Sequence, residues 1–227
     1  MIGAYIAIVM GVAVWAALVP TGKRLPDNVM RGITVFGGAF LLAVCFLDLV
    51  PEMTETGSVL PCVAVLVGFV VQQLLEGLSA HAEHGHVEGR TAIVGLMVGL
   101  SLHAFLEGMP LVYVDGVVNR GLLFGILIHN IPVALILVGV MLGKNFGFWR
   151  VLALLVLFGV MSPLGSLVNL YVVQPDEQMQ HFIMGLVVGV LLHVSSSILF
   201  DHKQHDALWL NLGLCIAAFA LAFLTVH

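Results

Sequence analysis

His103 and Glu107 stand four residues apart inside the long apolar segment TAIVGLMVGLSLHAFLEGMPLVYV. A spacing of four residues places both side chains on one face of an α-helix. A third candidate, His129, lies in the middle of the next apolar segment, at a similar depth in a membrane. Two imidazoles and one carboxylate form a ligand set that Zn²⁺ and similar divalent cations accept. Because ionisable side chains inside a membrane are costly, the three residues predict a functional metal site.

The same residues also have a simpler interpretation. His103 and Glu107 could hydrogen-bond to each other, and His129 could be a satisfied interior histidine. For any one of them taken alone, this interpretation is favoured. The coincidence of all three at one depth favours a metal site instead.

The composition identifies the elements that must position these residues. Of the 227 residues, 60% are hydrophobic and 9% are charged, and the mean hydropathy is +1.11. Soluble proteins carry about 25% charged residues, so we expect an all-α integral membrane protein. A span needs about 20 residues, so this length holds about eight spans with short loops. We predict eight transmembrane helices in one transmembrane domain covering 1–227, at about residues 2–19, 31–50, 58–78, 91–113, 120–142, 149–173, 181–200 and 207–225.

The basic residues predict the orientation of the chain, because Lys and Arg favour cytoplasmic loops. Those on one side of the predicted spans are Lys23, Arg24, Arg31, Arg90, Lys144, Arg150 and Lys203, with Arg120 alone on the other side. Both termini are therefore expected outside the cytoplasm. The outer side carries mainly acids, namely Asp48, Glu52, Glu55, Asp115, Asp176 and Glu177. Such a cluster would raise the local cation concentration at the outer face.

The two histidine-bearing segments look alike. Both GLSLHAFLEG (99–108) and GILIHNIPVA (125–134) begin with Gly and have His at the fifth position. Consecutive spans run in opposite directions, so this similarity predicts an inverted repeat about a pseudo-two-fold axis in the membrane plane. Pro132 would free a backbone carbonyl near residue 128 and loosen the helix beside His129. The alternative is an ordinary proline tolerated in a membrane helix.

These segments resemble the metal-binding spans of the ZIP (Zrt/Irt-like) divalent-metal transporters. The family's fourth-span motif, H-N-x-P-E-G, is similar to HAFLEG from His103, and its fifth-span motif, H-N-I-P-E-G, is similar to HNIPVA from His129. The resemblance implies eight spans, both termini outside, and metal ligands on spans 4 and 5. Residue by residue, it implies His103, Glu107, His129 and Asn130 as ligands.

Two positions depart from these motifs. Ala104 replaces the asparagine of the first motif, and Val133 replaces the glutamate of the second. Family members with a two-metal centre use both of those polar residues. Glu107 alone neutralises half of one divalent charge, so we expect a single metal ion at the centre.

Other histidines could bind metal as accessory ligands. The predicted inner loop AHAEHGHVEGR is a short His-rich tract of the kind that binds metal loosely. Its histidines are His81, His84 and His86. In the seventh span, His193 could join or flank the central site, or be a hydrogen-bonded packing residue. Glu76 would line the exit or reach the membrane interface.

The expected function is a carrier, not an enzyme, that moves a divalent transition metal ion into the cytoplasm. Zn²⁺ is the expected substrate, Fe²⁺, Mn²⁺ and Cd²⁺ are further options, and no catalytic cofactor is expected. The expected location is the cell (inner) membrane. The partners are the lipid bilayer and, as an option, a second copy of the chain in a homodimer, without nucleic acid. The resemblance also implies an elevator-like displacement of spans 4 and 5 against a static part formed by spans 2, 3, 7 and 8.

Two other functions remain as alternatives. The first is an intramembrane zinc-dependent hydrolase, in which the metal activates water. Glu107 could not serve there both as a ligand and as a separate general base. The second is a non-transporting metal-binding membrane protein, which the residues Val133 and Ala104 make credible. Radiolabelled zinc uptake separates both from a carrier.

Overall fold

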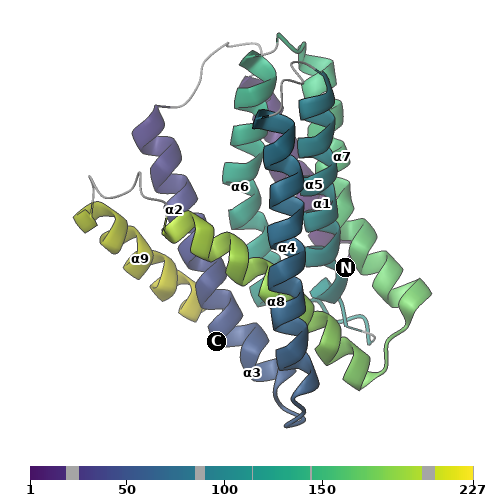
Figure 1. The fold of residues 1–227 in the computed structure, drawn as a ribbon. Helices are drawn as coiled ribbons and strands as arrows, with labels where there is room; N and C mark the ends of the chain where they lie inside the picture. The colour runs from purple at the N-terminus through teal and green to yellow at the C-terminus, as the bar shows by residue number, and fades with distance from the viewer. Residues whose placement is uncertain (19–25, 85–89, 114, 144, 201–207, 227) are drawn as a thin grey trace.

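The computed structural model describes residues 1–18, 26–84, 90–113, 115–143, 145–200 and 208–226, and this part of the chain is almost entirely helical (Figure 1). The elements are α1 (Ile2–Ala13) with the 3₁₀ turn η1 (Val14–Leu18), α2 (Asp27–Val44) with the π-helical turn η2 (Cys45–Leu49) and α3 (Val50–Met53), α4 (Leu60–His84), α5 (Arg90–Gly108) with the 3₁₀ turn η3 (Met109–Leu111), α6 (Arg120–Gly143), α7 (Phe148–Val168) with the π-helical turn η4 (Asn169–Val173), α8 (Glu177–Leu199) and α9 (Leu208–Val226). One isolated antiparallel bridge joins Val112 to Val118 between α5 and α6.

Within the described residues, seven helical segments are long and apolar enough to cross a membrane, and residues 2–17 form a shorter apolar helix. The chain is thus an all-α, multi-pass membrane protein. The predicted spans coincide with these helices to within a few residues at most ends. The predicted span 58–78 agrees with the apolar part of α4, Leu60–Gly77, but the helix continues to His84, whereas a loop was predicted from residue 79. Helix formers such as Leu78, Ala80 and Ala82 extend the helix beyond the apolar run that defined the predicted span.

Two pairs of helices pack with their backbones in contact. A Cβ atom at Gly68 of α4 would overlap the carbonyl oxygen of Leu186 in α8, and one at Gly189 of α8 would overlap that of Val65 in α4. Glycines at such positions let membrane helices approach closely. The α4–α8 pair is therefore held tightly together.

The second close pair is α5 and α7. Gly108 of α5 lies against the carbonyl oxygen of Ser162, and Gly165 of α7 lies against that of Phe105, again too close for a Cβ atom. Glu107 and His103 are on α5, so the α7 backbone holds the helix that carries them. His103 and Glu107 are thus carried by the α5–α7 pair, whereas α4 belongs to the α4–α8 pair.

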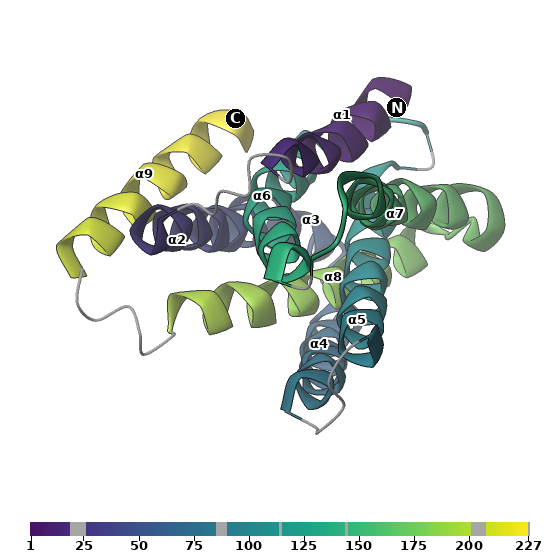
Figure 2. The same cartoon turned by 90° about the horizontal axis from the view of Figure 1, so that it is seen from above.

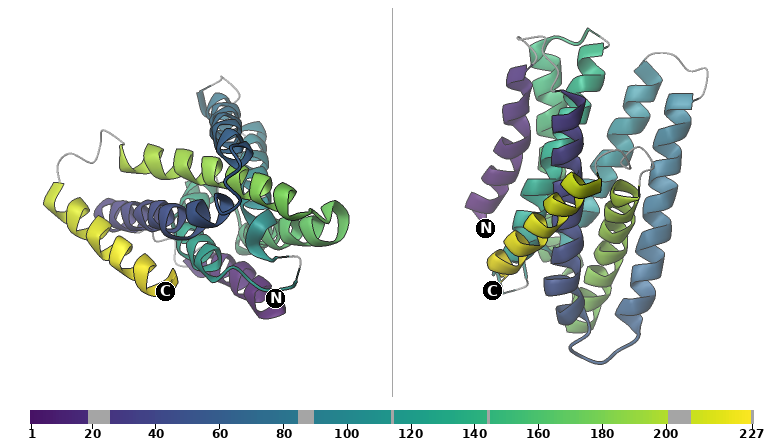
Figure 3. Two further views of the ribbon diagram at one scale, coloured as in Figure 1. Left: turned by 90° about the horizontal axis from the view of Figure 1, so that it is seen from below. Right: turned by 90° about the vertical axis from the view of Figure 1, so that its left-hand side faces the viewer.

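The remaining contacts sort the helices into two groups. One group contains α1, α5 and α7, the other contains α2, α4, α8 and α9, and α6 contacts both, touching α2 more extensively than α1 or α7. Viewed from above, α8 lies beside both α2 and α4 (Figure 2). The α4–α5 contact and the contacts of α6 with α1 and α2 join the two groups. Both chain ends lie toward the end of the bundle where α3 leads into α4 (Figure 3).

The helix α6 runs through Pro132 without interruption. A Cβ atom at Gly37 of α2 would lie 3.5 Å from the Pro132 ring and 3.7 Å from the carbonyl oxygen of Ile128. Both distances are ordinary van der Waals contacts, so α2 packs against this turn of α6 with room for a Cβ atom at position 37. The predicted loosening beside His129 does not extend to a break in the helix.

Candidate metal centre

The candidate site begins with His103 on α5, which is almost completely buried. Its Nδ1 lies 3.1 Å from Oε1 of Gln72 on α4, within hydrogen-bonding distance. Its Nε2 lies 3.8 Å from Oε2 of Glu107, one turn along the same helix. That second distance is too long for a hydrogen bond. The spacing of four residues therefore brings the two side chains together, as predicted, but leaves a gap between them.

Glu107 is fully buried, and neither of its carboxylate oxygens has a hydrogen-bond partner among the described residues. The Nε2 atom of His103 also lacks one. Buried polar atoms are nearly always hydrogen-bonded, so three unpartnered atoms at one point require an explanation. An imidazole nitrogen and a carboxylate are both electron-pair donors toward a metal, and a divalent cation would satisfy them together.

His129 on α6 faces His103 from the neighbouring helix. The two rings have centroids 5.6 Å apart and are nearly perpendicular, at 73°. His129 is 2% exposed, and its Nδ1 has no hydrogen-bond partner in the described part of the chain. The structure thus places His103 beside both His129 and Glu107.

The fourth predicted ligand, Asn130, is also buried, and both polar atoms of its amide are unpartnered among the described residues. It follows His129 directly on α6 but does not line the cavity described below. Among the residues that the structure describes, no three His, Cys, Asp or Glu side chains are close enough to hold one ion together. The His103 and His129 rings must approach each other to share a metal with Glu107.

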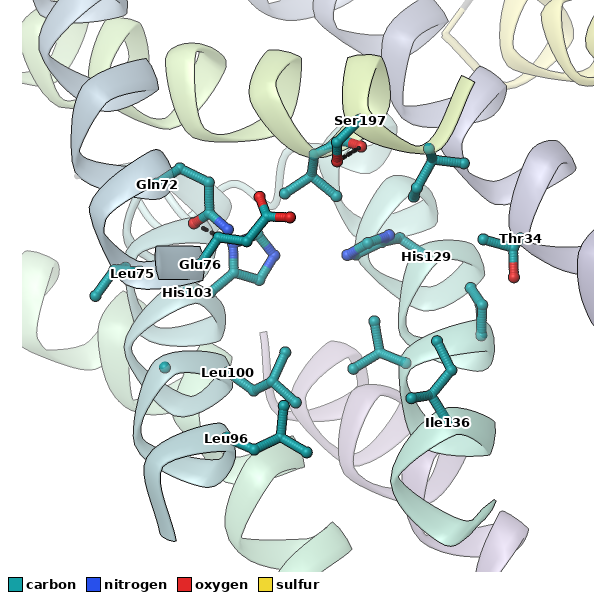
Figure 4. A pocket seen from close by; sticks show the side chains of 15 residues that line it. Thr34, Gln72, Leu75, Glu76, Leu96, Leu100, His103, His129, Ile136 and Ser197 are labelled. Atoms are coloured by element: carbon teal, nitrogen blue, oxygen red, sulfur yellow. Dashed lines mark hydrogen bonds between the residues drawn. The ribbon is translucent and has the colours of Figure 1, made fainter. Parts of the chain in front are cut away.

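A cavity of about 290 Å³ opens beside the two histidines (Figure 4). Its lining comes from five helices: Thr34 of α2, Gln72, Leu75 and Glu76 of α4, Leu96, Gly99, Leu100 and His103 of α5, His129, Pro132, Val133 and Ile136 of α6, and Val194, Ser197 and Ile198 of α8. From the histidines, the lining continues toward the start of α5 and the end of α6. Glu107 lies on the opposite side of His103, outside the lining. The cavity therefore approaches His103 and His129 from the side away from Glu107.

The chain was compared with known proteins. A family model described as ZIP Zinc transporter matches residues 76–225, about two thirds of the chain. The chain belongs to the ZIP zinc transporter family. No individual curated protein gives a match. Membership in the ZIP family makes the chain a divalent-metal transporter by family, and the matched region contains all of α5 and α6.

The two departures from the ZIP motifs occupy different surroundings. Val133, one turn after His129, lines the cavity with an apolar side chain. Ala104 is fully buried in an apolar cluster with residues of α1, α6 and α7. A carboxylate at position 133 would thus have faced the cavity, whereas Ala104 packs against other helices.

Of the accessory candidates, only the side chain of His193 is described. Its Nδ1 lies 3.4 Å from Oε2 of Glu76 on α4, and its ring packs edge-on against Phe69. His193 therefore pairs with Glu76 near the mouth of the cavity and does not join His103 and His129. His81 and His84 lie in the last turns of α4, and His86 lies outside the described residues.

The opposite end of the site is closed by packed side chains. Leu49, Leu111, Leu122 and Ile126 are fully buried there in one apolar cluster. Such a cluster excludes a water-filled path between Glu107 and that end of the bundle. Beyond it, a separate cavity of about 440 Å³ is lined by residues that include Asp48, together with Tyr113, Asn119 and Arg120.

Hydrogen bonds reinforce this closure. The Tyr113 hydroxyl donates to Oε2 of Glu52 at 2.7 Å and accepts from Nδ2 of Asn119 at 2.7 Å. The Oδ1 of Asn119 accepts from the backbone N–H of Leu122 in the first turn of α6. Burial and the hydrogen bond to Glu52 raise the pKa of Tyr113, so its phenol stays protonated. The network ties the α5–α6 connection to α3.

Sequence reasoning missed Gln72 as a neighbour of the site. A glutamine inside the apolar run LVGFVVQQLLEG is a visible signal, but Gln73 beside it is exposed, and the pattern did not separate the two. The partners Glu76 and His193 were each noted, but their pairing joins residues far apart in the sequence.

Proposed function

We propose that this ZIP-family chain carries a divalent transition metal ion, Zn²⁺ before Fe²⁺, Mn²⁺ or Cd²⁺, through a site formed by His103, Glu107 and His129. The observation that supports it most is the buried, unpartnered pair formed by Nε2 of His103 and the Glu107 carboxylate, one helical turn apart. An uncompensated carboxylate within a membrane is costly, and a cation supplies the missing interactions. Two nitrogen ligands and one oxygen ligand suit Zn²⁺.

The proposed centre holds one metal ion. A second cation about 3.5 to 4 Å from the first needs bridging carboxylates to offset the repulsion between the ions. Glu107 supplies one carboxylate, and the side chain on the cavity wall one turn after His129 is the apolar Val133. Asn130 or water would complete the coordination shell. One glutamate leaves a net positive charge, which an anion or water must help to stabilise.

The direction of transport follows from the cavity and the charges. The cavity extends from the histidines toward the end of the bundle that carries the loops after α4 and α6, and the predicted topology puts seven of the eight Lys and Arg residues on this side. Basic loops favour the cytoplasm, so in this proposal the cavity faces the inside. The chain would cross the cell membrane eight times, with residues 2–17 as the first span and both termini outside. Asp48 and its neighbouring acids would attract cations to the closed outer end.

Alternating access requires the closed and open ends to exchange. In this proposal α1, α5, α6 and α7 move together as the ligand-bearing group, and the α2–α6 and α4–α5 contacts are where it would slide against α2, α4, α8 and α9. We place the pseudo-two-fold axis of the proposed inverted repeat between α5 and α6. Displacement of the ligand-bearing group would carry the metal past the static helices. Both sets of helices belong to one transmembrane domain.

Accessory binding takes place at the inner end in this proposal. His193 and Glu76 would bind the ion loosely as it leaves the cavity, and the histidines at 81, 84 and 86 would capture it afterwards. The helices α9 and α4 expose most of their apolar residues, which suits contact with lipid. In a homodimer, two copies of the chain would meet through one of these faces.

Uptake of radiolabelled Zn²⁺ into proteoliposomes tests the proposed function. Proteoliposomes that contain the purified chain should accumulate the ion in their lumen. The variants His103→Ala and Glu107→Ala should reduce uptake to the level of empty liposomes. Zinc binding without uptake would instead identify a non-transporting metal-binding protein. Release of a hydrolysis product in the absence of uptake would identify an enzyme.

A further inference from the structure

We infer that Gln72 is a positioning residue of the metal site. Its amide oxygen accepts a hydrogen bond from Nδ1–H of His103 and thereby keeps Nε2 of His103 deprotonated and directed toward Glu107. This inference rests on the proposed function, because it takes His103 as a metal ligand. It adds a residue of α4 to a site that was assigned to α5 and α6 alone.

The two distances around the His103 ring select this arrangement. A neutral imidazole has one N–H donor and one acceptor nitrogen. Nδ1 lies 3.1 Å from Oε1 of Gln72, a normal hydrogen-bond length, whereas Nε2 lies 3.8 Å from Oε2 of Glu107, which is too far for one. A proton on Nδ1 makes the short contact favourable. A proton on Nε2 would leave Nδ1 and Oε1, both acceptors, facing each other at 3.1 Å.

The consequence is a pair of donors prepared for a cation. With the proton on Nδ1, the lone pair of Nε2 and the carboxylate of Glu107 face each other, both buried and without hydrogen-bond partners among the described residues. Metal-binding histidines commonly donate their second ring N–H to an oxygen acceptor, which fixes the ring and makes the ligating nitrogen more basic. Gln72 is the oxygen acceptor in this case.

The packing of α4 fixes Gln72 in place. Gln72 is 8% exposed and lies one turn beyond Gly68, where α4 and α8 are in backbone contact. Burying an amide is costly unless it is hydrogen-bonded. The bond to His103 also crosses from α4 to α5, between the two helix groups. The orientation of the ligand therefore depends on how the groups are placed relative to each other.

The first test measures Zn²⁺ affinity of the purified, detergent-solubilised chain by isothermal titration. Gln72→Leu should weaken binding about 10- to 100-fold, the range found when such supporting residues are removed from metal sites. Gln72→Glu keeps an oxygen acceptor and should bind at least as tightly as the unmodified protein. Gln73→Leu is the matched control, since Gln73 is exposed on the next position of α4, and its affinity should not change.

The second test locates the ring proton of His103 in the unmodified protein. Nitrogen-15 NMR of histidine-labelled, metal-free protein distinguishes a proton on Nδ1 from one on Nε2, and the His103→Gln variant identifies the signal of His103 by its loss. A proton on Nδ1 is expected, and Gln72→Leu should reduce its population. Protonation at Nε2 in the unmodified protein would overturn the inference, as would equal zinc affinity of Gln72→Leu and Gln73→Leu. If His103→Ala itself leaves zinc affinity unchanged, the proposed metal site fails instead.

Discussion

The replacement of Glu107 by glutamine should have opposite effects on metal binding and on the metal-free protein. The substitution keeps the size and shape of the side chain and removes its charge. Glu107 is fully buried, and neither carboxylate oxygen is hydrogen-bonded within the described residues. A residue with this environment contributes little to the stability of the empty protein. Its contribution appears when a cation binds.

The magnitude follows from the loss of one partner in a buried charge pair. Such a loss typically costs about 3 to 5 kcal/mol. Since about 1.4 kcal/mol corresponds to a tenfold change in affinity, Glu107→Gln should weaken Zn²⁺ binding about 10²- to 10³-fold or more. Without metal, an amide costs less to bury than a carboxylate, so the unfolding temperature should stay the same or rise.

Thermal unfolding with and without Zn²⁺ measures both effects, and tryptophan fluorescence can follow it. At a zinc concentration about 100 times the dissociation constant, the unmodified protein should gain about 2.7 kcal/mol, and Glu107→Gln should lose this gain. Glu177→Gln, which changes an exposed glutamate at the start of α8, is the control and should keep it. A marked loss of stability in metal-free Glu107→Gln, with the zinc effect intact, would show that Glu107 has a structural role. That result would contradict the prediction that its charge matters only when a cation binds.

Three further results are expected. Val133→Glu places a carboxylate on the cavity wall and should tighten zinc binding or raise the stoichiometry in titrations, so unchanged binding would contradict the mononuclear explanation. Tyr113→Phe removes the hydrogen bond to Glu52 and should lower the free energy of unfolding by about 1 to 3 kcal/mol while zinc affinity is kept, in contrast to Tyr171→Phe at an exposed position. Deletion of residues 81–86 should lower zinc uptake or its regulation, but the tightest binding step should persist in titrations. Loss of that step would mean that the main site is misplaced.

The sequence predicted the membrane helices closely where hydropathy changes sharply at their ends. The segment 120–142 corresponds to α6 (Arg120–Gly143), and 149–173 corresponds to α7 with η4. Hydropathy did not predict the end of α4, because residues 79–84 (SAHAEH) lie beyond the apolar run yet are helical. A polar segment can continue a membrane helix outside the hydrocarbon layer, so the end of the apolar run is not the end of the helix.

The candidate site could be predicted only in part. Helical spacing placed His103 beside Glu107, since four residues separate them on one helix. The approach of Gln72 to His103 and of Glu76 to His193 depends on how α4 packs against α5 and α8. Periodicity within one helix has no information on these contacts. Glycines such as Gly68 indicate close packing but do not identify the partner helix.

One divalent metal ion is proposed to bind between α5 and α6, and anomalous diffraction at the zinc absorption edge would locate it. Crystals of the unmodified chain grown with Zn²⁺ should show one strong anomalous peak, bonded to Nε2 of His103, the carboxylate of Glu107 and the imidazole of His129. Two strong peaks between these helices would contradict the mononuclear centre. A strong peak whose ligands come mainly from other helices, with none beside Glu107, would contradict the site itself.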